Sequence, residues 1–156
     1  MCGRFTLTVE LSDIQQDLGI KVDDVMIDWS PSYNISPTQT VLTVNQLGER
    51  KIKPMRWGLI PSWAKDESIG SKMINARSET LHEKPSFRKS LLSRRCLILA
   101  DGFYEWKSNP GGSKIPYYFQ IADHSLFLFA GLWDTWQPKK GMPIESCTVI
   151  TCEANS

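Results

Sequence analysis

The sequence predicts an α+β fold with a mostly antiparallel, barrel-like β-sheet core and a few short helices. Short apolar runs rich in β-branched and aromatic residues recur along the chain, and loops containing glycine and proline separate them. Only two segments have the spacing of an amphipathic helix, and both are short. Several short strands with few helices favour an antiparallel sheet that closes on itself.

The first expected helix begins at Ser12 and ends before Gly19. Ser12 and Gln15 have the spacing of a capping box, and Ile14 and Leu18 fall on one face of a helix. Gly19 can adopt the left-handed conformation that ends a helix. We expect this helix to have a structural role.

A β-hairpin is expected next along the chain. Residues 41–44 and 51–57 flank a turn at residues 47–50, and Pro54 indicates that the second strand lies at an edge or contains a bulge. A second helix is expected over residues 86–93. The remaining strands are expected over residues 96–100, 117–121, 126–130 and 146–151.

Composition indicates one soluble domain over residues 1–156. The chain has 18 Lys and Arg residues against 17 Asp and Glu residues, a net charge of +1, and 41% of its residues are apolar. No apolar run approaches the roughly 20 residues of a membrane span, and the amino terminus lacks a secretory signal. We therefore expect no membrane partner and a cytoplasmic location, associated with the nucleoid if the source is bacterial. The near-zero charge argues against purely electrostatic DNA binding but allows a local basic groove.

The four cysteines do not have the spacing of a metal site. Cys2, Cys96, Cys147 and Cys152 include no C-x-x-C pair, so we expect neither a metal ion nor another cofactor. Cys147 and Cys152 bracket a strand at an odd separation, which directs their side chains to opposite faces. Cys96 lies in an apolar strand and is expected to be a small core residue.

Cys2 has unusual chemistry because of its position. Removal of Met1 would leave Cys2 with both a free α-amine and a thiol, and such a 1,2-aminothiol condenses with aldehydes to form a thiazolidine ring. The amine and thiol titrate near about 8.0 and 8.5, so we expect neutral amine and thiolate to coexist at cellular pH, with Arg4 raising the thiolate fraction. Position alone is equally consistent with an early cysteine of no chemical role.

Two polar residues stand in aromatic or apolar runs. Glu105 lies between two large aromatic residues, which suits a carboxylate that transfers protons near neutral pH, although an edge-strand Glu paired with Lys107 or an Arg would give the same pattern. Asn75 and Arg77 share one side of an extended segment and could hold a sugar hydroxyl and a phosphate. Asn75 could instead be a turn residue that bonds its own backbone.

The segment over residues 57–63 contains too many turn-forming residues for a regular element. Most tryptophans are core residues, but Trp63 is the better candidate for stacking on an unpaired base. His82 and His124 lie in polar surroundings, and we assign no role to either.

Six sequence blocks together resemble the SRAP family, the SOS-response-associated peptidases or abasic-site-processing proteins. The blocks match in order and spacing, and they cover residues 1–5, 33–38, 57–63, 75–80, 95–96 and 101–106. Residues 130–133 and 148–151 extend the resemblance to almost the whole chain. The resemblance implies an SRAP-like fold and a protein that acts on abasic sites in single-stranded DNA.

The resemblance also implies roles for individual residues. Cys2 would match the family's nucleophile, which joins the ring-opened aldehyde of an abasic site through a thiazolidine. Asn75 would orient the sugar and the N-terminal residue, and Glu105 would shuttle protons during ring opening and imine formation. These three residues are the expected catalytic set.

The same resemblance implies DNA contacts. Arg4 and Arg77 are similar to the family's phosphate-binding arginines. Trp63 and Pro37 resemble the surfaces on which the DNA is bent or stacked.

The chain departs from the family pattern at its carboxy-terminal end. Members normally continue beyond residues 151–155 into a segment in which a His precedes Arg-Met-Pro and assists acid–base steps and crosslink reversal. This sequence ends at Ser156, and neither His82 nor His124 lies in such a motif. We therefore expect a single SRAP-like domain that either is a truncated form or lacks this part of the machinery. Crosslink formation is expected to survive, and the reaction rate, crosslink release and the stability of the sheet are expected to be affected.

The favoured function is that of a monomeric DNA-damage protein of the SOS response. It would shield abasic sites by covalent attachment to single-stranded DNA, with a lyase-like character. One alternative is a thiol peptidase, a hydrolase that cleaves its own Met1–Cys2 bond. Another is a non-covalent single-strand-binding module, in which Trp63, Arg77 and Arg4 matter and Cys2 does not.

Overall fold

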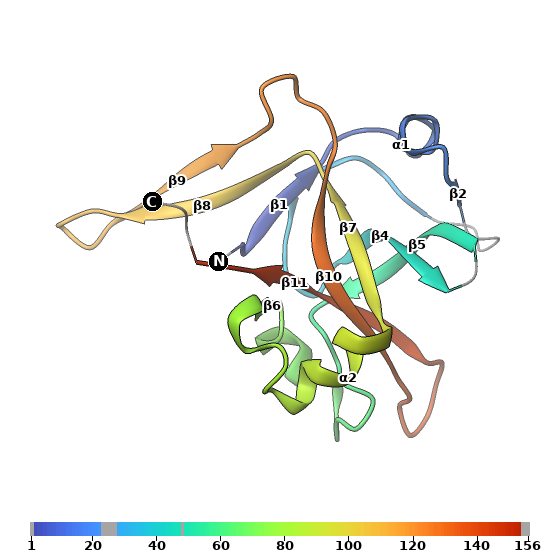
Figure 1. Ribbon diagram of the computed structural model, residues 1–156. Helices are drawn as coiled ribbons and strands as arrows, with labels where there is room; N and C mark the ends of the chain where they lie inside the picture. Colours follow the sequence, from blue (N-terminus) through green and yellow to red (C-terminus); the bar gives the residue numbers. More distant parts are fainter. Residues whose placement is uncertain (1, 23–27, 48, 154–156) are drawn as a thin grey trace.

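The computed structural model describes residues 2–22, 28–47 and 49–153 (Figure 1). Its centre is a barrel in which β5, β4, β7, β10 and β11 follow one another and β11 returns to pair with β5. These strands are β4 (Thr40–Leu47), β5 (Glu49–Trp57), β7 (Arg95–Ala100), β10 (Phe127–Trp136) and β11 (Ile144–Thr151). The closing pair is parallel, with Ser146 opposite Arg56, and the other neighbours are antiparallel. The predicted fold class is confirmed.

Two short strands extend the barrel sheet. β2 (Lys21–Val22) runs parallel to β5, and β6 (Asn75–Arg77) runs parallel to β11. Ala76, the central residue of β6, is buried in a small apolar cluster that includes Phe87. Ile74, which directly precedes β6, packs on the larger cluster.

A second sheet covers one side of the barrel. Its order is β3-β1-β8-β9, and its strands are β1 (Arg4–Leu7), β3 (Ser32–Ile35), β8 (Gly102–Ser108) and β9 (Lys114–Phe119). Phe5 of β1 joins the two sheets, because its ring lies 4.9 Å from that of Trp57 and 5.8 Å from that of Phe129. In Figure 1 the β8–β9 hairpin extends away from the barrel. One apolar core therefore holds β1 against the barrel.

The helices are short and cover the ends of the barrel. α1 spans Leu11–Leu18 and α2 spans Pro85–Ser93, and two 3₁₀ helices, η1 (Glu67–Lys72) and η2 (Ser78–Thr80), flank β6. The expected start of α1 at Ser12 is wrong: Glu10 is the residue before the first turn, and no side chain caps it. The expected end is confirmed, because Gly19 has a φ of 59°.

The expected hairpin is the β4–β5 pair, in which Leu42 lies opposite Pro54. Residue 48 of its turn lies outside the described residues. On its other side β5 pairs with β2 at Lys51 and Ile52 and with β11 at Arg56 and Trp57. Pro54 lies between these two short pairings. No described strand pairs with β5 at Pro54 on this side, so the missing N–H of proline breaks no hydrogen bond there. Pro54 is therefore in the situation of a residue on an edge strand, although β5 lies inside the sheet.

The three cysteines that follow β1 in the sequence differ in burial. Cys96 and Cys147 are buried in the core, whereas Cys152 is exposed. Within the described ranges, no three His, Cys, Asp or Glu side chains are grouped so that they could hold a metal ion. No helix in those ranges has the length and apolar character needed to cross a membrane.

Candidate functional site

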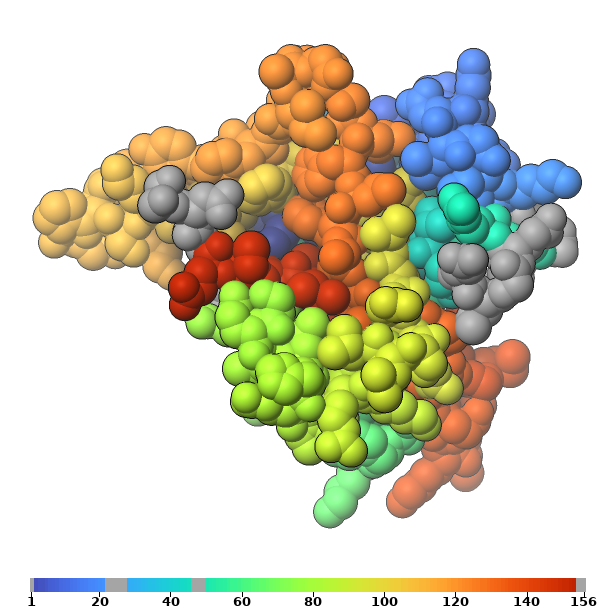
Figure 2. Space-filling model, viewed as in Figure 1, coloured from blue at the N-terminus to red at the C-terminus, as the bar shows by residue number. Residues whose placement is uncertain are grey.

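Cys2 lies at the start of β1, against the core between the two sheets. Only 5% of its surface is exposed, and its Sγ is 3.7 Å from the backbone carbonyl oxygen of Arg4, to which the thiol donates. Figure 2 shows the dark blue amino-terminal atoms in a hollow bordered by the β8–β9 hairpin and by the red strand β11.

Strand register brings Glu105 close to Cys2. Arg4 of β1 lies opposite Tyr104 of β8, and Phe5 lies opposite Phe103. Continuing this antiparallel register places Glu105 beside Gly3, the residue next to Cys2. Glu105 is half-buried, and its charge acts on the Cys2 thiol.

Burial raises the pKa of the Cys2 thiol from 9.0 to about 11, and the negative charge of Glu105 adds to this increase. The hydrogen bond to the Arg4 backbone and the positive amino terminus act in the opposite direction but are weaker. The expectation of an appreciable thiolate fraction concerns the chain without Met1 and stays a prediction; in the chain that carries Met1, the raised pKa keeps the thiol protonated at neutral pH. The guanidinium of Arg4 is directed elsewhere, since its Nη1 donates to Asn34 Oδ1 at 2.8 Å.

Asn75 reaches Cys2 from the opposite sheet. Its Nδ2 donates a hydrogen bond of 2.8 Å to the carbonyl oxygen of Cys2. Its Oδ1 is buried and accepts no hydrogen bond from the described residues. An unpaired buried acceptor is costly, and it points to a donor that a ligand or a processed terminus supplies. The turn-residue interpretation of Asn75 is wrong, because Asn75 lies in β6 and bonds across 73 positions of sequence.

Several contacts fix the position of Asn75. Val149 of β11 lies opposite Asn75, and its N–H donates to the carbonyl of Ile74 at 3.0 Å. The indole Nε1 of the buried Trp57 donates to the same carbonyl at 3.0 Å. Sequence reasoning treated Trp57 as a core residue only, and its buttressing role depends on the barrel closure.

The carboxy-terminal end of β1 is fixed by a buried carboxylate that sequence reasoning missed. Asp101 Oδ1 accepts from the Thr6 hydroxyl at 2.5 Å, and Oδ2 accepts from the Thr8 N–H at 2.5 Å and from the Thr8 hydroxyl at 2.6 Å. Asp101 directly precedes the segment that carries Glu105. Asp101 therefore holds β1 and β8 together at the ends that lie away from Cys2 and Glu105. No local sequence pattern predicts this contact.

Besides Arg4, the residues expected to contact DNA lie on three different segments. Arg77 is exposed at the end of β6 and shares the Asn75 face by strand alternation. Trp63 is 59% exposed on the loop after β5. Pro37 is half-buried, and Thr38, which follows it, has a φ of 73°, a conformation uncommon for a β-branched residue.

The loop that carries Trp63 is anchored on both sides. The Ser62 N–H donates to Asp134 Oδ2 at 2.8 Å, and the Trp136 indole donates to the Ala64 carbonyl at 2.8 Å. Asp134 also pairs with Arg94, which follows α2. The exposed position expected for Trp63 is confirmed, and these anchors hold the indole outward.

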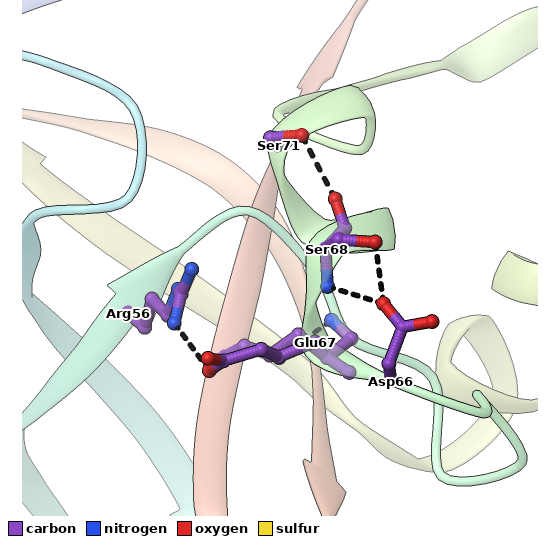
Figure 3. A network of polar contacts seen from close by, with 7 residues as sticks. Arg56, Asp66, Glu67, Ser68 and Ser71 are labelled. Atoms are coloured by element: carbon purple, nitrogen blue, oxygen red, sulfur yellow. Dashed lines mark hydrogen bonds and ion pairs between the residues drawn. The ribbon is translucent and has the colours of Figure 1, made fainter.

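A polar network shapes the segment between Trp63 and Asn75 (Figure 3). Arg56 Nη1 donates to Glu67 Oε2 at 2.9 Å. Asp66, the residue before η1, accepts from both the N–H and the hydroxyl of Ser68 in its first turn, and the Ser71 hydroxyl donates to the Ser68 carbonyl at 2.8 Å. The network links the end of β5 to η1, directly before β6.

The arrangement brings a thiol, a carboxylate and a primary amide together: the charge of Glu105 acts on the Cys2 thiol, and Asn75 bonds the Cys2 carbonyl. These groups suit the addition of a sulfur nucleophile to a carbonyl, and no step of such an addition requires a metal ion.

Comparison with known proteins gives consistent matches over most of the chain. Residues 1–156 match the family model described as SOS response associated peptidase (SRAP). The chain is 50% identical over 156 residues to the abasic site processing protein YoqW of Bacillus subtilis, and the match covers 99% of this chain and 70% of YoqW. It is 34% identical over 159 residues to the abasic site processing protein HMCES of Gallus gallus, with coverage of 81% of this chain and 47% of HMCES.

A solved structure has a similar fold. The crystal structure of a protein from Bacteroides thetaiotaomicron superposes with a TM-score of 0.87 at 30% sequence identity. The superposition covers 99% of this chain and 69% of that chain.

Proposed function

This chain belongs to the SOS response associated peptidase (SRAP) family, and from its amino-terminal geometry we propose that it forms a covalent crosslink with abasic sites in single-stranded DNA. Relatives that match almost its whole length are named abasic site processing proteins. The nucleophile is Cys2 after removal of Met1. The product protects the abasic site during the response to DNA damage.

The contact between Asn75 and Cys2 carries the proposal. An ordinary buried cysteine needs no side-chain amide on its carbonyl, yet Asn75 holds that carbonyl at 2.8 Å from another sheet. The unpaired Oδ1 of Asn75 lies on the same amide. Once Met1 is removed, this oxygen can accept from the α-amine of Cys2 or from a hydroxyl of the sugar. One amide would then orient both reactants.

The chemistry needs no oxidant or reductant. The neutral α-amine of Cys2 attacks the C1′ aldehyde of the ring-opened sugar, and loss of one water gives an imine. The thiol then adds to the imine carbon through sulfur, and its proton passes to the imine nitrogen. The five-membered thiazolidine contains both nucleophiles, which explains why a first-position cysteine, rather than an internal one, suits the reaction.

Glu105 is the group that we assign to the proton transfers of this reaction. Its charge acts on the Cys2 thiol, so the two groups are close. We assign Glu105 to remove the thiol proton during addition and to protonate the leaving hydroxyl during imine formation. Asn75 is assigned to orientation, and Arg4 and Arg77 to contacts with phosphates of the strand. Trp63 and Pro37 are assigned to stacking and bending of the DNA.

The test is a denaturing gel of protein mixed with single-stranded DNA that carries one abasic site. We expect a shifted band that survives denaturation, and we expect Cys2→Ala to remove it. Cys152→Ala is the matched control, because Cys152 is exposed and lies outside the site. Intact mass of the active protein is expected to show that Met1 is absent.

A result in which Cys2→Ala binds the DNA normally, and neither protein gives a stable band, would favour the non-covalent module. Retention of Met1 on protein that crosslinks would contradict the proposal directly, because the α-amine of Cys2 would then be part of a peptide bond.

A further inference from the structure

The outward face of the four-stranded sheet carries a cluster of aromatic side chains that the crosslinking site does not use. Strand alternation places Tyr104 and Trp106 of β8 on the face opposite to Phe103 and Glu105. Tyr118 of β9 lies beside them: its ring centroid is 4.9 Å from that of Tyr104, and that of Trp106 is 6.5 Å from that of Tyr104. Trp106 and Tyr118 are 41% and 42% exposed. We call Tyr104, Trp106 and Tyr118 the aromatic platform.

The orientation of Tyr118 is built into the backbone beneath it. A Cβ on Gly102 would lie 2.1 Å from the Tyr118 hydroxyl, so only glycine allows the ring to lie there. The Thr6 hydroxyl donates to the Asp101 carboxylate, so it accepts from the Tyr118 hydroxyl at 2.8 Å. Gln120 Nε2 completes this series by donating to the Tyr118 hydroxyl at 3.0 Å.

Tyr104 is fixed as well. Its hydroxyl donates to the backbone carbonyl of Tyr33 at 3.2 Å, and Tyr33 is itself 71% exposed. Exposed aromatic rings held by hydrogen bonds lose little conformational entropy when a ligand stacks on them. The two tyrosines of the platform are thus preorganised for flat ligands.

The charges on this face favour an anionic ligand. Arg4 lies directly opposite Tyr104, and Lys114 lies on the same side of β9 as Tyr118. Among the described strand residues of this face, none carries a carboxylate: Glu105 points to the other face. The nearby Asp101 is 3% exposed and accepts hydrogen bonds from Thr6 and Thr8.

The free edge of this sheet disfavours a second copy of the chain as the occupant. β9 is the outermost strand of the sheet order, and Pro116 lies at its centre opposite Trp106. The Asn109 N–H bonds to the Ser113 carbonyl, and alternation from this pair directs the backbone nitrogen of residue 116 to the free edge. Proline has no N–H to offer there, so a neighbouring strand would lose a ladder bond.

We propose that the aromatic platform binds bases of single-stranded DNA that flank the abasic site, with Arg4 on an adjacent phosphate. The inference rests on the proposed function, because it adds a binding surface to the same DNA substrate. Cys2 is only two residues from Arg4, about 7 Å along a strand, so one DNA strand can contact both. Stacking on aromatic rings tolerates any sequence, as a damage-binding protein requires.

The test measures affinity for an intact single-stranded oligonucleotide without an abasic site, by fluorescence anisotropy. We expect Trp106→Ala to weaken binding by at least about fivefold and Trp106→Phe to retain most of the affinity, since stacking on one base is worth roughly that or more. Leu92→Ala is the control, because Leu92 is 78% exposed on α2, away from the platform. Thermal unfolding of each variant confirms that it is folded.

Gly102→Ala provides a second, independent variant. It leaves every platform side chain in the sequence but displaces Tyr118, so we expect it to weaken the same binding. Unchanged affinity in folded Trp106→Ala protein would overturn the proposal. So would an effect of Trp106→Ala on self-association in sedimentation experiments with no effect on DNA affinity.

The crosslinking assay separates the two proposals. Crosslink formation is therefore measured on the wild-type protein, alongside the affinity of Trp106→Ala for intact DNA. If the wild type forms no crosslink but Trp106→Ala still weakens DNA binding, the proposed function fails and the platform remains. If the wild type forms the crosslink and the platform variants bind DNA like the wild type, only the platform proposal is contradicted.

Discussion

The side-chain amide of Asn75 donates a 2.8 Å hydrogen bond to the carbonyl oxygen of Cys2, and so joins β6 of the barrel sheet to the start of β1 in the other sheet. This contact spans the recess between the two sheets. It places Cys2, the amino terminus of the proposed processed form, against an amide whose Oδ1 has no partner among the described residues. The geometry leads to a first prediction about Asn75 itself.

Asn75→Asp is expected to slow crosslink formation by about 100-fold, the cost of misplacing a reacting group by roughly 1 Å. The new carboxylate cannot donate to the Cys2 carbonyl and repels it. The rate is measured in a single-turnover time course on DNA with one abasic site. Asn109→Asp, in the β8–β9 turn, introduces the same chemical change outside the site. Equal rates for both variants would remove Asn75 from the mechanism.

Glu105→Gln is expected to have effects of opposite sign on two measurements. The Glu105 charge raises the pKa of the Cys2 thiol, so its removal lowers that pKa and increases the thiolate at a given pH. A role limited to electrostatics would therefore accelerate crosslinking. A proton-transfer role predicts slower crosslinking, by about 100-fold or more, with DNA affinity nearly unchanged.

The pKa is followed through the pH dependence of alkylation at Cys2. Glu83→Gln is the control, because Glu83 is exposed and distant from the recess. A faster crosslinking rate in Glu105→Gln would count against the assigned role.

Local patterns predicted most of the elements, because strands and helices reflect nearby residues. The end of α1 at Gly19 and the β4–β5 hairpin follow from glycine and from alternating apolar residues. The start of α1 does not follow, since Ser12 has the right type and spacing for a cap but lies inside the first turn. Backbone hydrogen bonds from Asp13 and Ile14 to Glu10 settle the boundary instead.

The site could be predicted only in part. The residues Cys2, Asn75 and Glu105 follow from the family resemblance, but the raised pKa of Cys2 does not, because burial depends on tertiary packing. Asp101 illustrates the same limit: its hydrogen bonds to Thr6 and Thr8 span more than 90 positions of sequence. No local window of sequence contains such a contact.

Removal of Met1 is expected to lower the pKa of the Cys2 thiol from about 11. The positive amino terminus already lowers this pKa, and processing brings that charge onto Cys2 itself. Protein from cells with inhibited methionine aminopeptidase retains Met1 and should be alkylated slowly at neutral pH, with a rate that rises about tenfold per pH unit up to the pKa. In protein without Met1, the alkylation rate should reach its maximum at a lower pH. Identical profiles would show that the terminal charge does not reach the thiol.

Rising salt is expected to weaken the initial binding of DNA but to leave a formed crosslink intact. Phosphate contacts by Arg4 and Arg77 would be weakened as counterions compete, so the rate of crosslinking at limiting protein should fall as salt rises. A formed thiazolidine is covalent and should persist when salt is added afterwards. Arg77→Ala should reduce the salt slope by about one unit. An adduct that dissociates in salt would show that the linkage is not covalent.

A close backbone approach between Gly58 and Gly70 is expected to control both stability and the position of Asn75. Gly58 has a φ of 121°, and a Cβ there would lie 2.5 Å from the backbone oxygen of Gly70. The backbone cannot yield cheaply, because the Gly58 N–H bonds to the Cys147 carbonyl at 2.8 Å and the next N–H, that of Leu59, bonds to the Met73 carbonyl at 3.0 Å.

Gly58→Ala should therefore lose more than about 2 kcal/mol of unfolding free energy, a melting temperature lower by roughly 5 °C or more. Gly111→Ala is the matched control, since a Cβ at that position would have no atom within 4 Å. Because residues 59 and 73 are bonded just before β6, the strain displaces Asn75, and folded Gly58→Ala protein should crosslink more slowly than Gly111→Ala. A stability loss with an unchanged crosslinking rate would show that β6 keeps its position through β11 alone.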